Sequence, residues 1–244
     1  MSKTNIFSKK LKHISDLINN LLEKNLNKLN SKNFSFLLKN NKIILTIVAL
    51  FVIFISYLLL PTFYNQQNIS KQLKNELQNK FDLSFNFSQD IKYNLFPRPH
   101  FTTIESTIIS NQNKISKINK LKIFISFDNL LSLKNIEVRD LILENANFNL
   151  NNKNYNFFLD LLKKNFEKGK LIIKDSNVFF RHLEDEVLFI SKIFKMKYYY
   201  EPKELKNIFY AENEIFNIPF SIKSFFGKDK NKIFSSINLN IVKL

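Results

Sequence analysis

The sequence predicts a mostly β protein that carries one transmembrane helix. Over most of the second half of the chain apolar residues alternate with polar ones, which is typical of strands with one apolar and one polar face. Near the N-terminus, by contrast, 18 consecutive residues from Ile43 to Leu60 carry no charge. Hydrophobic residues make up 45% of the 244 residues, enough for the core of one or two domains.

The uncharged run predicts a membrane anchor over residues 43–63, with Ile43 and Leu60 marking its ends. About 20 apolar residues span a bilayer, and the stretch up to residue 63 has 21 uncharged ones. A cleaved signal peptide fits less well, because the preceding segment is 42 residues long and no small-x-small cleavage site follows. We therefore expect an uncleaved, single-pass anchor.

The charges on either side of this run predict its orientation. Residues 1–42 hold nine lysines and two acids, whereas the first basic residue after the run is Lys71. Under the positive-inside rule the N-terminus lies in the cytoplasm. Residues 64–244 then form a periplasmic domain, and the protein is expected in the inner membrane.

The cytoplasmic segment has apolar residues every three to four positions, the period of one helix face. Three interpretations fit: an amphipathic helix on the anionic membrane surface, a helix that binds a partner or itself, or a weakly ordered tail that only fixes topology. The apolar positions are Phe7, Leu11, Ile14, Leu17, Ile18, Leu21, Leu22, Leu26 and Leu29.

The periplasmic segment is expected to hold two short helices and about a dozen strands, mostly antiparallel. Apolar residues at helical spacing predict the first helix over Ile69–Lys80, and Phe157–Asn165 suggests the second. The alternating runs are Phe81–Phe87, Ile91–Leu95, Leu121–Phe127, Ala146–Leu150, Met196–Tyr200 and Ile237–Ile241.

A sheet with one apolar face has to cover it with a second sheet, a helix or lipid. A closed sandwich and a groove filled by acyl chains are both consistent with the alternation. For each candidate groove residue the alternative, which the pattern favours slightly, is an ordinary core position. The candidates are Phe85, Phe87, Leu121, Ile123, Ile125, Phe148 and Leu150.

Composition excludes several classes of chemistry. The chain has no Cys, three His and only two Gly, Gly169 and Gly227, so thiol catalysis, Cys-ligated metals and a glycine-rich phosphate loop cannot be built. The polar cluster His182–Glu186 predicts a hairpin turn rather than a metal site. Lysine is spread along the chain despite the net charge of +16, which argues against nucleic-acid binding. We expect no metal, no cofactor and no enzymatic activity.

The order of elements after the anchor resembles the N-terminal part of the AsmA family, from Tyr64 to Phe158. That pattern has an anchor ending near a proline, an amphipathic helix, a strand pair, a Leu-Phe-Pro-x-Pro segment and further strands. The matching segments here are Ile69–Lys80, Phe81–Phe87, Ile91–Leu95, Leu95–Pro99, Phe101–Ser110, Ile118–Phe127, Leu130–Leu143 and Ala146–Leu150, with Leu171–Phe180 similar to the next strand.

The resemblance implies a curved antiparallel sheet with an apolar groove for acyl chains. It also implies binding or transfer of membrane phospholipid in the periplasm, or a role in outer-membrane assembly, in company with other envelope proteins. The sequence departs from the family in its longer cytoplasmic segment and in having Asn and Lys where turns often have Gly. A dozen strands would span roughly 60 Å, too short to bridge two membranes alone. The alternative function is a non-catalytic anchored adaptor domain with a closed β core.

Overall fold

The structure is a computed structural model that describes residues 42–88, 90–110, 113–128, 130–132, 134, 136–163, 169–182, 186–226 and 233–239. The chain divides into two compact units, Met1–Ser56 and Tyr57–Leu244. The amphipathic pattern of the first 41 residues lies outside the described residues, so its three interpretations stay predictions.

The predicted anchor is helical. Helix α3 covers Lys42–Leu59 and is followed by the short 3₁₀ helix η1, Leu60–Phe63. The stretch Leu45–Phe63, from α3 to the end of η1, is long and apolar enough to cross a membrane. Only 11% of its most apolar 18-residue segment is buried by other parts of the protein. A helix that was part of a soluble core would be largely buried, so its exposed apolar side chains fit a lipid environment.

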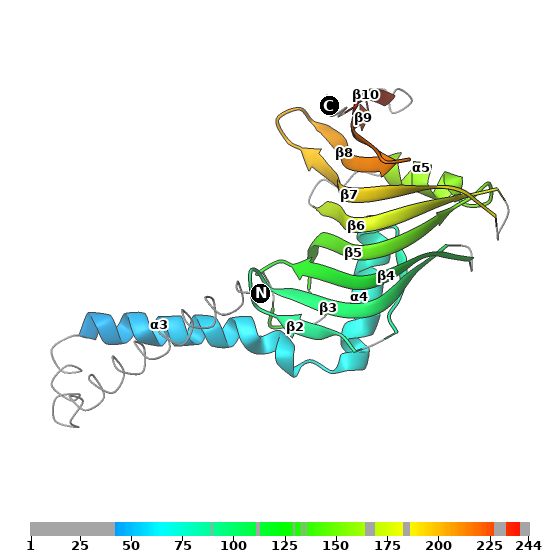
Figure 1. Cartoon of the computed structure of the whole chain (residues 1–244). Coiled ribbons are helices and arrows are strands. Elements are labelled where there is room, and N and C mark those ends of the chain that lie inside the picture. The colour runs from blue at the N-terminus through cyan, green and yellow to red at the C-terminus, as the bar shows by residue number, and fades with distance from the viewer. Residues whose placement is uncertain are drawn as a thin grey trace, which may run out of the picture. The chain divides into compact units, whose positions relative to one another are not determined.

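The second unit is built on a single open sheet of ten strands (Figure 1). The strand order is β1-β3-β4-β5-β6-β7-β8-β9-β10, and β2 also pairs with β3. The strands are β1 (Ser84–Asn86), β2 (Lys92–Asn94), β3 (His100–Ser110), β4 (Asn113–Ile125), β5 (Val138–Leu150), β6 (Lys170–Arg181), β7 (Val187–Glu201), β8 (Lys206–Ile215), β9 (Ile218–Phe226) and β10 (Ile233–Leu239).

The described strands form one open sheet, so the predicted mostly β fold with an open, groove-type sheet is confirmed. The closed sandwich, the other alternative, is not found among these strands, and neither is the closed β core of the alternative function. Helices take the place of a second sheet as the cover of the apolar face. Helix α4 (Gln66–Phe81) lies against the sheet near β1 and β5, and α5 (Tyr155–Lys163) connects β5 to β6 (Figure 1). Two of the expected strands also differ, because β1 and β2 are three residues long and pair with β3 rather than with each other.

Helix α4 forms because its sequence has a good cap and one apolar face. The Asn65 side chain accepts hydrogen bonds from the N–H groups of Gln67 and Asn68, as expected for an N-cap residue. The helix ends at Phe81, where Asp82 adopts the left-handed conformation. Phe81 was predicted as the first residue of a strand; it is instead the last residue of the helix, and its ring is fully buried.

Strands β5 and β6 form the one parallel pair among the described strands; the other pairs are antiparallel. A parallel pair cannot be joined by a tight turn, so the chain has to cross over the sheet, usually as a helix. This requirement explains α5, which the sequence predicted at Phe157–Asn165. The hairpin turn was predicted at His182–Glu186. Strands β6 and β7 form an antiparallel pair, and between them the His182 N–H donates to the Glu186 carbonyl oxygen (3.2 Å), while residues 183–185 lie outside the described residues.

Candidate functional site

One part of the apolar sheet face is covered by α4. Ile69, Leu73, Leu77 and Phe81 recur every four residues and are at most 2% exposed. They belong to the same hydrophobic core as the apolar side chains of β3, β4 and β5. Because a helix row of this spacing presents one continuous apolar ridge, α4 closes the face over the first strands.

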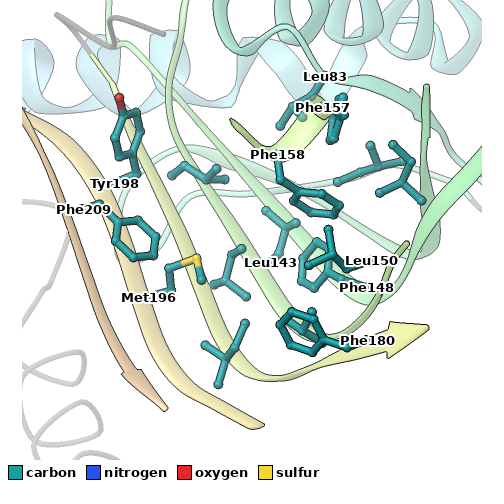
Figure 2. Close-up of a pocket in the computed structure, with 16 residues that line it drawn as sticks. Leu83, Leu143, Phe148, Leu150, Phe157, Phe158, Phe180, Met196, Tyr198 and Phe209 are labelled. Carbon is teal, nitrogen blue, oxygen red and sulfur yellow. The ribbon is translucent and has the colours of Figure 1, made fainter. Parts of the chain in front are cut away.

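The face is not closed further along the sheet, where an apolar cavity of about 340 Å³ opens (Figure 2). This volume lies in the range of small-molecule sites. Sixteen side chains line it, from the α4–β1 connection, from β3 to β8 and from α5. They are Leu83, Ile108, Ile115, Leu143, Phe148, Leu150, Phe157, Phe158, Leu171, Ile173, Val178, Phe180, Ile193, Met196, Tyr198 and Phe209.

Helix α5 provides one wall of the cavity through two aromatic rings. The ring of Phe158 meets that of Phe148 edge to face with centroids 6.3 Å apart, and Phe157 packs on Phe158 at 5.4 Å. Both geometries are favourable for aromatic pairs. The short crossover between the parallel strands therefore places two phenyl rings over the sheet face.

The cavity lining carries no charged side chain, and Tyr198 contributes its one side-chain oxygen. A phenol is neutral at physiological pH, and burial raises the pKa of Tyr198 further above its ordinary value of 10. Such a lining offers dispersion contacts and exclusion of water but hardly any hydrogen bonding. It is suited to a hydrocarbon chain and unsuited to a sugar, a nucleotide or an ion.

Two of the seven candidate groove residues, Phe148 and Leu150, line this cavity. Four others, Phe85, Leu121, Ile123 and Ile125, are at most 5% exposed in the core that α4 covers, and they do not reach it. Phe87 is half-buried beside α4, with the Lys74 ammonium 5.4 Å from its ring centroid.

Sequence reasoning did not select the side chains from β6, β7, β8 and α5. A partial signal existed, because Met196–Tyr200 alternates like the runs that were chosen, whereas Leu171–Phe180 has apolar residues at both ends and four polar residues between them. The pairing of the strands shows which residues of neighbouring strands lie side by side, which alternation within one strand does not show. Tyr198 pairs with Leu171 on one side and with Phe209 on the other, which places all three on the cavity face.

Besides the apolar cavity, a group of hydrogen bonds lies where the chain leaves the candidate membrane span. The Tyr57 hydroxyl donates to the Phe127 carbonyl oxygen (2.9 Å) and accepts from the Leu130 N–H (3.0 Å). The Tyr64 hydroxyl donates to the Leu130 carbonyl oxygen. Tyr57 and Tyr64 are thus hydrogen-bonded to the segment that follows β4.

The chain matches a known protein family over residues 38–170, more than half of its length. The chain belongs to the AsmA family. A search of curated proteins found no match. The AsmA segment contains the anchor, α4, β1 to β5 and α5, whereas the cavity residues from β6, β7 and β8 all lie beyond it. Family and apolar helix together fit a membrane-anchored protein of the cell envelope.

Proposed function

We propose that the protein binds phospholipid by taking an acyl chain into the apolar cavity, and that it handles lipid at the inner membrane without a catalytic step. The observation that carries this proposal is the composition of the lining, fifteen apolar side chains and one neutral tyrosine. Each methylene moved from water into such a site contributes about 0.8 kcal/mol. A straight hydrocarbon segment is therefore the ligand that gains most from this cavity.

A polar pocket beside the cavity supports binding of an amphiphile rather than of pure hydrocarbon. Phe157 lines the apolar cavity on one side and a pocket of about 460 Å³ on the other. That second pocket is lined by side chains of both charges and by amides. They include Gln78, Asp82, Asn113, Lys153, Asn154, Asn156 and Asp160. A lipid whose chain lies under Phe157 can place its headgroup among these groups.

The proposed location follows from charge and topology. The nine lysines before the apolar helix favour a cytoplasmic N-terminus, and the sheet domain then lies in the periplasm. Nine strand positions at about 4.8 Å each span roughly 40 Å, less than the dozen strands expected from the sequence. This length favours a shuttle, or one section of a longer path that other envelope proteins complete.

The proposal is tested by lipid that purifies with the full-length chain. Val178→Asp places a carboxylate in the cavity wall, and Ile172→Asp is the matched control, because Ile172 is a half-buried β-branched residue on the opposite face of the same strand. Detergent-purified protein is analysed by native mass spectrometry and lipid extraction, and folding by circular dichroism.

We expect the wild type and Ile172→Asp to retain phospholipid and Val178→Asp to lose it while staying folded. Wild-type protein that is folded and free of lipid would contradict the proposal. So would equal lipid retention by both variants, because the lipid would then lie elsewhere on the protein, for example around the anchor.

A further inference from the structure

The turn between β8 and β9 carries an aromatic residue in a conformation that aromatic residues rarely adopt. Ile215 pairs with Ile218, so the turn consists of Phe216 and Asn217 alone, and both have positive φ angles, 52° and 62°. Two-residue turns of this type favour Asn and Gly, which tolerate that region. A bulky side chain is strained there, yet the Phe216 ring is 76% exposed and gains little from packing.

Exposed apolar side chains surround this turn on both faces of the sheet. Leu188, Ile190 and Ile218 are 57%, 46% and 51% exposed. Ile218 lies on the cavity face, because the regular β8–β9 register connects it to Phe209. Leu188 and Ile190 lie on the other face, because they flank Phe189, which stacks on the cavity residue Phe180. We call Leu188, Ile190, Phe216 and Ile218 the apolar tip.

The apolar tip is connected to the cavity by aromatic contacts. The Phe180 ring, at the border of the cavity in Figure 2, stacks on Phe189 with centroids 4.2 Å apart. Phe189 in turn lies 6.2 Å from Phe216. An unbroken row of rings thus leads from the lipid cavity to an exposed end of the sheet.

The tip lies at the end of the sheet opposite to the residues that bind Tyr57. Tyr57 is bonded to residues just after β4 ends. Strands β4, β7 and β9 run in one direction, and β5, β6 and β8 in the other, so the β8–β9 turn lies at the far strand ends.

We infer that the apolar tip inserts into the surface of a phospholipid bilayer. A protein partner would cover one face of the sheet, whereas side chains that are apolar on both faces fit a medium that surrounds the tip. The row of rings then carries acyl chains between the cavity and the bilayer. This step rests on the proposed function. Charges of both signs are near the tip, because Lys192 pairs with Glu214 and Arg181 lies across from Val187 beside Glu186. The inference is therefore for a zwitterionic surface.

The chain contains no tryptophan, so Phe216→Trp creates a single fluorescent reporter at the tip. Leu205→Trp is the matched control: Leu205 is also in a turn, has a φ of 49° and is 75% exposed, but it sits among Lys203, Glu204 and Lys206. Each full-length variant is placed in nanodiscs and mixed with phosphatidylcholine vesicles. Brominated lipid is introduced either into the nanodisc or into the vesicles.

We expect brominated lipid in one of the two bilayers to quench the tip reporter and shift its emission to shorter wavelength, with much less effect at Leu205→Trp. Absence of quenching in both arrangements, or equal quenching of both reporters, would overturn the inference. Phe216→Asn provides a second test, because asparagine suits the turn. It should stay folded and, where the vesicles quench the tip reporter, lose most of the binding to vesicles that the wild type shows. Unchanged vesicle binding would then also overturn the inference.

The two proposals fail separately. Phe216→Asn leaves the cavity lining intact and should still purify with lipid. A chain that retains cavity lipid but shows no quenching would contradict only the inference about the tip. A chain whose tip is quenched but whose cavity holds no lipid would contradict only the proposed function.

Discussion

The phenol oxygen of Tyr93, in β2, donates a 2.6 Å hydrogen bond to the carbonyl oxygen of Leu58, in the last turn of α3. The last four carbonyl groups of a helix have no partner within it, so the phenol satisfies a group that would otherwise need water. We expect Tyr93→Phe to lower the free energy of unfolding by about 1 kcal/mol, the usual net value of one hydrogen bond. Thermal unfolding in detergent measures the loss. Tyr155→Phe, at an exposed position, is the control and should change little.

The same phenol predicts a loss of stability at high pH. Burial, and then the neighbouring Tyr64, raise the pKa of Tyr93 from 10 to about 12. The folded protein therefore holds this proton more tightly than the unfolded chain does. The contribution is complete below pH 10 and disappears as the pH rises through 12. Unfolding free energies measured from pH 9 to 12 should fall less steeply in Tyr93→Phe than in the wild type; parallel curves would contradict the assignment.

Gly169 is required by close packing where β6 begins beside β5. A Cβ atom at this position would lie 2.7 Å from the Arg139 carbonyl oxygen and 3.3 Å from Cζ of Phe81. The nearest atom belongs to the backbone, so a strand has to move to relieve the contact. We expect Gly169→Ala to destabilise the domain by about 1–3 kcal/mol, in the range of overpacked cores. Lys170→Ala, next to it and exposed, should be nearly neutral in the same unfolding assay.

Glu76 in α4 is expected to weaken the fold at neutral pH. Partial burial raises the pKa of its carboxyl above the ordinary 4.5; Lys80 opposes the shift and Glu137 adds to it. The folded state thus binds the proton more tightly, and stability falls as the pH rises through the folded pKa. Glu76→Gln should therefore be more stable than the wild type at pH 7. At pH 4 the difference should be much smaller, and a constant difference from pH 4 to 7 would contradict this explanation.

The secondary structure followed from the sequence wherever one period extended over many residues. The uncharged run predicted α3, the Ile69-Leu73-Leu77 spacing predicted α4, and alternation predicted parts of β4, β5, β7 and β10. Strands β3 and β6 followed from the family resemblance, and β8 and β9 were not predicted individually. The failures are local. Phe81 continues the alternation of the residues after it, but it also continues the helical spacing from Leu77, and packing in the core decides for the helix.

The position of the cavity could not be predicted from alternation, because that pattern indicates which face is apolar but not what covers it. Ile123 and Phe148 occur in equally good alternating runs. Ile123 lies in the core that α4 covers and Phe148 in the cavity, a difference that arises from tertiary packing. The open sheet depends likewise on β10 remaining unpaired with β1, which no local pattern encodes.

The orientation of the anchor is tested by single cysteines, which are clean reporters because the chain has no cysteine of its own. Ser2→Cys marks the N-terminal segment, and Lys203→Cys marks the exposed turn between β7 and β8. In intact spheroplasts a membrane-impermeant maleimide should label Lys203→Cys at once and Ser2→Cys only after lysis, because the lysine-rich segment stays in the cytoplasm. The reverse pattern would place the sheet domain in the cytoplasm, and labelling of both before lysis would exclude a membrane-spanning anchor. The reverse pattern would remove the periplasmic setting on which the proposed lipid handling depends, and labelling of both would remove the anchor at the inner membrane.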